Sequence, residues 1–301
     1  MKSEPAKESK QLVFWKRTAS TLGLWGAVAA GFASRIDWVY LVLLGALMWL
    51  ASREYFQMLR QSKVAGFPRF GVLVALVFAL SSGWFLFVRG EVPVGWDGAW
   101  VVGVLIGAFS LQLRHDIAGR RALEAVAFTL VGFVLIAVMF GFAARIVFLV
   151  PGPSEVAGAM VLLWMVAVTK FTDMGAYLVG SAVGRHKMIP HVSPGKTWEG
   201  FAGALIFSQL AGCGLYAFFR EDIAGFATGL GVLGGWGAVI GLSFVLALLA
   251  VVGDLAESVI KRSLDAKDSG HVLPGIGGAL DLIDSLCFTA PVLYFYLLWV
   301  L

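Results

Sequence analysis

Long apolar runs alternate with short charged segments along the chain. A helix needs roughly 20 mostly apolar residues to cross a bilayer. Nine stretches meet this requirement, at about 18–34, 36–52, 70–88, 96–113, 122–144, 157–180, 198–219, 230–253 and 280–301. The runs are continuously apolar and do not alternate in polarity, so they predict helices and not the strands of a membrane barrel. The pattern predicts an all-α polytopic integral membrane protein with about nine transmembrane helices.

The composition agrees with this reading. Hydrophobic residues make up 59% of the 301 residues and charged residues only 14%, against roughly 25% charged in soluble proteins. A soluble protein of this composition would not have enough polar surface to cover itself. The composition therefore excludes a soluble enzyme, a disordered chain and a nucleic-acid-binding protein.

The positions of Lys and Arg predict the topology. Counting from the N-terminus, the odd-numbered segments between spans hold 18 of these residues and the even-numbered ones hold 4, with Lys170 inside a span. Because cytoplasmic loops carry the excess of Lys and Arg, the N-terminus is expected in the cytoplasm and the C-terminus outside. Residues 1–17 are charged and lack a cleavage site after a short apolar core, so they predict a cytoplasmic tail.

The expected organisation is a single integral membrane domain over residues 1–301. Residues 18–150 form the N-terminal spans, and residues 151–301 contain the catalytic spans and cytoplasmic loops. In the N-terminal part, a segment with Arg53, Glu54 and Arg60 is interpreted as a cytoplasmic loop that contacts lipid headgroups. The less favoured alternative is that Glu54, at the end of the second span, lines a site.

Polar residues gather in the C-terminal part. Lys170 and Asp173 stand three residues apart within the sixth span, so they share one helical face. They predict a polar cavity that opens to the cytoplasm, with a structural ion pair as the alternative.

A second group lies in the cytoplasmic loop at 184–200. Ser193, Lys196 and Thr197 directly precede a predicted helix. Backbone N–H groups and the helix dipole favour anions at such a helix N-terminus. The loop is therefore predicted to bind phosphate groups, with an ordinary capped loop as the alternative.

The third group, at 253–285, has the highest density of charge. Asp254 and Glu257 are three residues apart, as are Asp281 and Asp284. The segment between these pairs contains Lys261, Arg262, Lys267 and Asp268. Carboxylates favour Mg²⁺, which keeps part of its coordination shell for water and substrate phosphate, and the basic residues suit phosphate oxygens. Together the groups predict a magnesium-dependent site that handles a polyphosphate at the inner membrane face.

The 253–285 segment resembles the signature of the phosphatidate cytidylyltransferase (CDP-diacylglycerol synthase) family. The matching positions are Ser258, Lys261, Arg262, Lys267, Asp268, Gly270, Leu273, Pro274, Gly277, Gly278, Asp281 and Asp284. The loop at 193–200 and the segment Asp173–Tyr177 are also similar to the family's. The chain departs from the pattern at Ile276, where the family has His, and at Leu282, where it has Arg.

The resemblance implies that CTP and phosphatidate are converted to CDP-diacylglycerol and pyrophosphate, with Mg²⁺ as cofactor in the form of one or two ions. The implied roles are substrate binding by Asp173, Ser193, Lys196, Thr197, Glu199 and Ser258, catalysis by Lys261, Arg262, Lys267, Asp268 and Asp284, and metal binding by Asp254, Asp281 and Asp284. The expected location is a bacterial inner membrane with the site on the cytoplasmic side. Membrane lipids are the expected partners, no nucleic acid is expected, and a homodimer is compatible with the family.

Three alternatives stay open at this point. A CTP-dependent lipid kinase would transfer the γ-phosphate instead of the nucleotidyl group. A non-catalytic paralogue is suggested by Ile276 and Leu282. A transporter is disfavoured, because transporters place ionisable groups near the midplane between repeated halves, and we detect no internal repeat.

Overall fold

The computed structural model describes residues 36–117, 119–150, 157–221, 229–266, 269–270 and 277–301. Most of these residues are helical. The α-helices are α2 (Asp37–Gln61), α3 (Pro68–Arg89), α4 (Trp96–Gln112), α5 (Arg121–Gly132), α6 (Phe140–Leu149), α7 (Ala157–Val183), α8 (Trp198–Phe219), α9 (Trp236–Ser263) and α10 (Ala279–Val300). A π-helix, η1 (Phe133–Met139), joins α5 to α6, and a 3₁₀-helix, η2 (Leu230–Leu233), precedes α9. Two short strands, β1 (Lys187–Ile189) and β2 (Ser193–Thr197), form an antiparallel hairpin.

Seven helical segments in the described part of the chain are long and apolar enough to cross a membrane. One of them combines α5, η1 and α6 into a segment of 29 residues. The 17-residue helix α4 coincides with a further predicted span. The predicted span at 18–34 and the tail at 1–17 lie outside the described residues. Apart from the β1–β2 hairpin, the regular structure of the described residues is helical, as expected for an all-α polytopic membrane protein, and the count of nine spans stays a prediction.

Helix α2 is longer than the predicted span at 36–52 and continues to Gln61. Residues 53–60, expected in a surface loop, instead form its last turns. Tyr55, Phe56 and Leu59 are buried there, whereas Arg53 and Arg60 are exposed. The loop interpretation was wrong because it followed the charges, while the apolar face of these turns packs against the rest of the protein.

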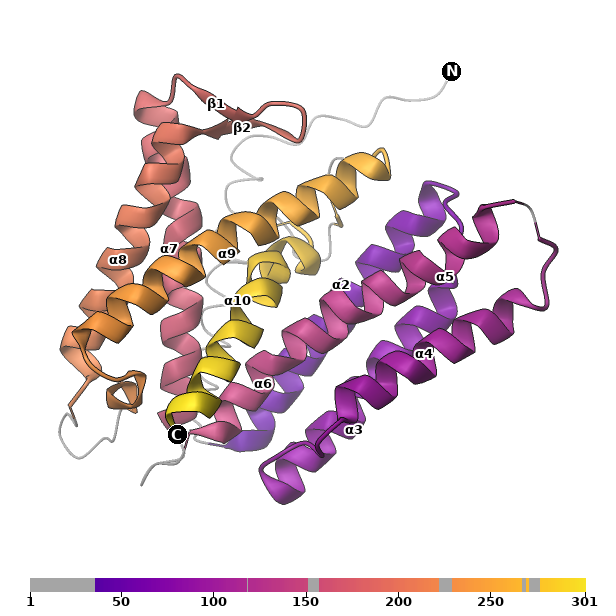
Figure 1. The fold of residues 1–301 in the computed structure, drawn as a ribbon, viewed down its shortest axis with the longest axis horizontal. Helices are drawn as coiled ribbons and strands as arrows, with labels where there is room; N and C mark the ends of the chain where they lie inside the picture. The colour runs from indigo at the N-terminus through magenta and orange to yellow at the C-terminus, as the bar shows by residue number, and fades with distance from the viewer. Residues whose placement is uncertain (1–35, 118, 151–156, 222–228, 267–268, 271–276) are drawn as a thin grey trace, which may run out of the picture.

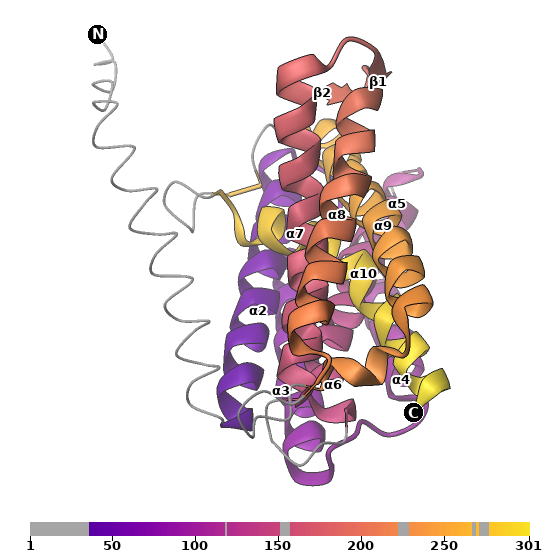
Figure 2. The same ribbon diagram turned by 90° about the vertical axis from the view of Figure 1, so that its left-hand side faces the viewer.

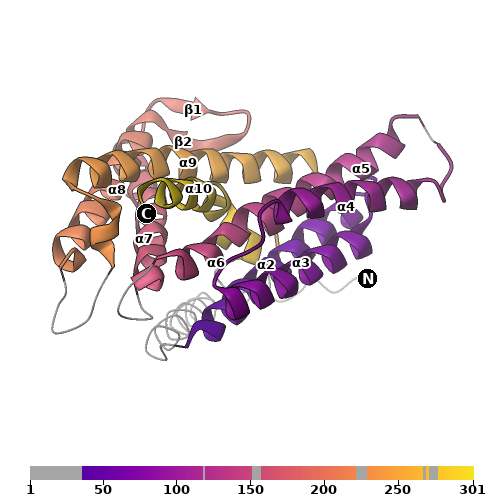
Figure 3. The same cartoon turned by 60° about the horizontal axis from the view of Figure 1, so that its bottom comes forward.

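The helices form two groups with α10 between them (Figure 1). The first group consists of α7, α8 and α9, and the second of α2 to α6; a view turned about the horizontal axis separates them clearly (Figure 3). Helix α10 packs against α9 and α7 of the first group and against α2 and α6 of the second. The start of α10 contacts both groups, because Leu280 N donates a hydrogen bond to Glu54 of α2 and Asp281 pairs with Lys261 of α9.

Helices α7 and α8 pack closely because glycines face each other along their contact. A Cβ atom on Gly203 would lie 2.6 Å from the Gly175 carbonyl oxygen, and one on Gly175 would lie 2.5 Å from the Gly203 carbonyl oxygen. Small residues allow such backbone contacts between membrane helices. The paired helices support the β1–β2 hairpin at their common end (Figure 2).

Candidate active site

The predicted phosphate-binding loop is the β1–β2 hairpin together with the start of α8. Lys187 pairs with Thr197, and Ile189 pairs with Ser193. Thr197 is the N-cap of α8, and its Oγ1 accepts a hydrogen bond from Gly200 N at 3.1 Å. This arrangement satisfies one free N–H of the helix end and directs the strand containing Lys196 toward the helix N-terminus.

Glu199, in the first turn of α8, accepts hydrogen bonds from the backbone just before β1. Its carboxylate accepts hydrogen bonds from Arg185 N at 3.1 Å and His186 N at 3.2 Å, and it lies 2.5 Å from His186 Nδ1. Glu199 therefore holds the segment that leads into β1. The predicted role of Glu199 in substrate binding stays a prediction.

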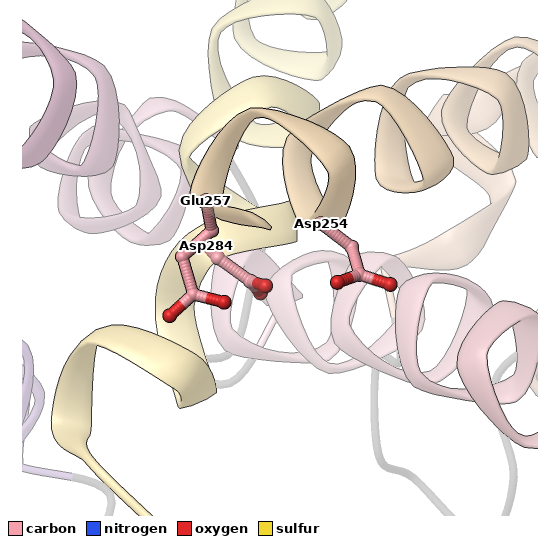
Figure 4. A group of neighbouring side chains, drawn as sticks. All are labelled: Asp254, Glu257 and Asp284. Carbon is pink, nitrogen blue, oxygen red and sulfur yellow. The ribbon is translucent and has the colours of Figure 1, made fainter. Parts of the chain in front are cut away.

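Three carboxylates from two helices converge beside this loop. Asp254 and Glu257 project from α9 and Asp284 projects from α10 (Figure 4). Each offers an oxygen that lies within 4.8 Å of the others. Glu257 is only 4% exposed and Asp284 only 9% exposed. Buried carboxylates this close together repel one another, and a cation between them would relieve that repulsion.

Lys261 lies next to this carboxylate group. Its Nζ is 2.7 Å from Glu257 Oε2 and 3.0 Å from Asp281 Oδ1. The other Asp281 oxygen, Oδ2, accepts a hydrogen bond from Gly278 N at 2.8 Å at the start of α10. Asp281 is thus held by a lysine and a helix N-terminus, and it is outside the group formed by Asp254, Glu257 and Asp284.

The donor atoms of the carboxylate group fit a hard divalent cation. Carboxylate oxygens are the preferred protein ligands of such ions. Glu257 Oε1 is buried and has no hydrogen-bond partner among the described residues, and an acceptor left in that state costs free energy. The cluster can therefore hold a metal ion.

A cavity of about 310 Å³ lies beside the loop and reaches Asp254, the one member of the carboxylate group among the described residues that line it. Its polar lining consists of Thr172, Asp173, Ser193, Lys196, Thr197 and Asp254, and its apolar lining includes Ala176, Tyr177, Met188, Phe201 and Val251. Within this lining, Lys196 Nζ lies 2.8 Å from Asp254 Oδ2. On α7, Lys170 Nζ lies 3.6 Å from Asp173 Oδ2. One cavity thus brings together three segments that are far apart in the sequence.

Other candidate residues take different positions. On α9, Ser258 is half-buried and Arg262 is exposed, and neither is among the described residues that line the cavity. Lys267 and Asp268 lie outside the described residues, as does Ile276. Leu282 is partly buried and packs against the hydrophobic core.

The sequence analysis gave no metal-binding role to Glu257 and did not favour a role for Glu54. Glu257 was paired with Asp254 by its spacing but was given no metal-binding role, although the shared helical face was a sufficient signal. Glu54 was interpreted as part of a surface loop, yet it is 3% exposed and lies against the start of α10. Its only sequence signal was an acidic residue at the end of an apolar run.

Comparison with known proteins supports a nucleotidyltransferase. A family model described as the cytidylyltransferase family matches residues 15–300. The phosphatidate cytidylyltransferase of Bacillus subtilis (strain 168) is 28% identical over 90% of this chain and 96% of its own length. That of Mycobacterium leprae (strain TN) is 34% identical over 87% of this chain and 79% of its own length. An uncharacterized protein of Escherichia coli (strain K12) is 36% identical over 65% of this chain and 61% of its own length. On this evidence, the chain belongs to the cytidylyltransferase family.

Proposed function

We propose that this protein transfers the cytidylyl group of CTP to phosphatidate, giving CDP-diacylglycerol and pyrophosphate. The observation that carries the proposal is the cavity in which Lys196 of the hairpin meets Asp254 of the carboxylate group. A nucleotidyl transfer requires a cationic group for the phosphates close to carboxylates that can hold a metal ion, and Lys196 and Asp254 bring these two kinds of group together on this cavity. The names of the relatives support phosphatidate as the acceptor.

The reaction needs little acid–base catalysis. A phosphate oxygen of phosphatidate, already ionised at neutral pH, attacks the α-phosphorus of CTP. A bond forms between that oxygen and the α-phosphorus, and the bond from the α-phosphorus to the bridging oxygen of the β-phosphate breaks. Pyrophosphate leaves with that electron pair. The barrier lies in bringing two anions together, so positioning and charge neutralisation are the main tasks of the protein.

The hairpin and the start of α8 would hold the triphosphate. Lys196 supplies an ammonium group, Ser193 and Thr197 supply hydroxyls, and the helix N-terminus supplies free N–H groups. Asp173 would shape the polar side of the same cavity.

The residues of α9 and of the segment after it would serve the second phosphate. Lys261 and Arg262, with Lys267, would bind the lipid phosphate or the departing pyrophosphate. Ser258 would contact the substrate, and Asp268 would act as a catalytic residue. The ion pairs of Lys261 with Glu257 and Asp281 support it, because they hold the ammonium group beside the acidic cluster.

Asp254, Glu257 and Asp284 are the residues that would hold Mg²⁺, and we keep Asp281 as a further proposed ligand. When bound, Mg²⁺ would neutralise charge on the phosphate groups. The bacterial relatives and the apolar helices support an inner-membrane location. The excess of Lys and Arg in alternate segments supports a cytoplasmic site. The diacyl chains would remain in the bilayer while CTP enters from the cytoplasm.

Labelled CTP tests this proposal. Purified protein in detergent would receive phosphatidate, Mg²⁺ and CTP labelled at either the α- or the γ-phosphate, with Asp284→Asn as the matched variant. We expect label to enter the lipid only from the α position and far more slowly with Asp284→Asn. Entry only from the γ position would indicate a lipid kinase. No transfer from either position, while a known cytidylyltransferase works alongside, would favour the paralogue or transporter alternatives.

A further inference from the structure

Glu54 makes a buried contact between the N-terminal spans and the start of α10. Its side chain comes from the last turns of α2 and is 3% exposed. Its Oε2 accepts a hydrogen bond from Leu280 N at 2.9 Å, in the first turn of α10. The first turn of a helix has free N–H groups and a partial positive charge, so a carboxylate there stabilises the helix end and fixes where it begins.

Two glycines make room for this carboxylate. A Cβ atom on Gly270 would lie 2.4 Å from Glu54 Oε1, and a Cβ atom on Gly278 would lie 2.5 Å from Glu54 Oε2. The carboxylate therefore touches the backbone on both sides of segment 271–276. Any larger residue at either position would displace the carboxylate or the backbone.

A second contact fixes the other end of the same region to α2. The Ser62 hydroxyl donates a hydrogen bond to the Leu264 carbonyl oxygen, just after the end of α9. Helix α2 and the residue directly after it, Ser62, thus contact the chain where α9 ends and where α10 begins. These two helices carry Asp254, Glu257 and Asp284, so α2 acts on the relative position of the helices that form the carboxylate group.

We propose that Glu54 is a positioning residue for the carboxylate group. It fixes the first turn of α10, where Asp281 directly follows Leu280 and Asp284 stands one turn further on. Ligand sites need their side chains held within roughly 0.5 Å of the productive geometry. Among the described residues, Glu54 belongs neither to the carboxylate group nor to the lining of the cavity. The effect of Glu54 on catalysis rests on the proposed function. Its effect on metal binding can be measured without any enzymatic activity.

The test compares Glu54→Ala, Glu54→Gln and a control, Ser52→Ala. Ser52 is also buried on α2, but its hydroxyl donates to Met48 O within the same helix. Binding of Mn²⁺ to the detergent-purified protein would be followed by electron paramagnetic resonance without any substrate. We expect Glu54→Ala to weaken Mn²⁺ binding by roughly 10- to 100-fold, as loss of a residue that supports metal ligands does. Ser52→Ala should bind like the unmodified protein.

Steady-state kinetics should show larger changes in kcat and in the Mg²⁺ requirement than in the KM for CTP. Glu54→Ala should lower kcat and raise the Mg²⁺ concentration for half-maximal activity, while the KM for CTP changes less than about threefold, because the hairpin is not altered. Glu54→Gln keeps an oxygen that can accept a hydrogen bond from Leu280 N. Its kcat and its Mg²⁺ requirement should therefore be close to those of the unmodified protein.

A double-mutant cycle with Gly270→Ala isolates the contact itself. The three atoms nearest to a Cβ on Gly270 all belong to Glu54. Gly270→Ala should therefore weaken Mn²⁺ binding in the unmodified background and have little further effect in Glu54→Ala. If Glu54→Ala does not fold, Gly270→Ala alone must still weaken Mn²⁺ binding.

If Glu54→Ala does not fold, unchanged Mn²⁺ binding by Gly270→Ala would overturn the proposal; if it folds, either of two results would do so. One is Mn²⁺ binding by Glu54→Ala that equals that of Ser52→Ala. The other is strictly additive effects of Glu54→Ala and Gly270→Ala. If the unmodified protein transferred no cytidylyl group, the proposed function would fail, but the Mn²⁺ series would still decide the role of Glu54.

Discussion

Lys196 and Asp254 form a contact of 2.8 Å that joins the hairpin to the carboxylate group. Lys196 comes from the strand before α8, and Asp254 comes from α9. Both line the same cavity. A substrate phosphate in this cavity would lie close to Lys196 and to Asp254, which belongs to the carboxylate group.

Lys196→Met should reduce kcat/KM for CTP by roughly 10- to 100-fold, the cost of losing one charge-assisted hydrogen bond. The reduction should appear mainly in KM, because Lys196 is proposed to hold the triphosphate before and during transfer. Steady-state kinetics with varied CTP would measure it. Lys187→Met is the control, since Lys187 is an exposed lysine on the same hairpin. Equal kinetics for the two variants would remove Lys196 from the site.

Removal of divalent cations should abolish activity, and Mg²⁺ should restore it. Asp284→Asn should weaken Mn²⁺ binding by at least about tenfold, because a buried carboxylate of the proposed ligand set loses its charge. Electron paramagnetic resonance titration of the purified variant would measure this. Asp116→Asn, at an exposed position after α4, should bind Mn²⁺ normally. Full activity in the presence of a chelator would contradict the metal site.

Lys261→Met should destabilise the protein by roughly 3–5 kcal/mol, because it leaves the buried Glu257 without its cationic partner. Thermal unfolding in detergent would follow the change. Adding Glu257→Gln should recover part of the loss, since the second substitution removes the unpaired charge. Arg262→Met, at the exposed neighbouring position, should unfold at the original temperature. A double variant less stable than Lys261→Met would argue against this ion pair.

Asp97→Asn should destabilise the protein by roughly 3 kcal/mol without changing the KM for CTP, because it breaks a largely buried ion pair. Arg145 contacts both Asp97 oxygens, with Nη1 at 2.7 Å from Oδ2 and Nη2 at 2.5 Å from Oδ1. This pair joins α4 to α6 and involves none of the residues that line the cavity. Glu91→Gln, at an exposed acidic position in the preceding loop, serves as control. A marked rise in the KM for CTP would show that the two regions are coupled.

The sequence by itself located most of the long helices. Seven predicted spans coincide with helical segments of the described part of the chain that are long and apolar enough to cross a membrane, and an eighth coincides with the shorter helix α4. In lipid every backbone polar group must be satisfied within its own segment, so a long apolar run is enough to specify a helix. The start of α8 was also readable from the sequence, because its cap, Thr197, directly precedes it in the chain.

Only the tertiary structure decided which acidic residues meet. The spacing of Asp254 and Glu257 places them on one face of α9, but it does not say what that face contacts. Asp281 and Asp284 have the same spacing, yet Asp284 joins the carboxylate group while Asp281 pairs with Lys261. That division depends on how α9 and α10 cross. In the same way, the burial of Glu54 depends on α2 packing against the start of α10. Contacts between distant segments arise from the packing of whole helices, and no local pattern in the chain encodes them.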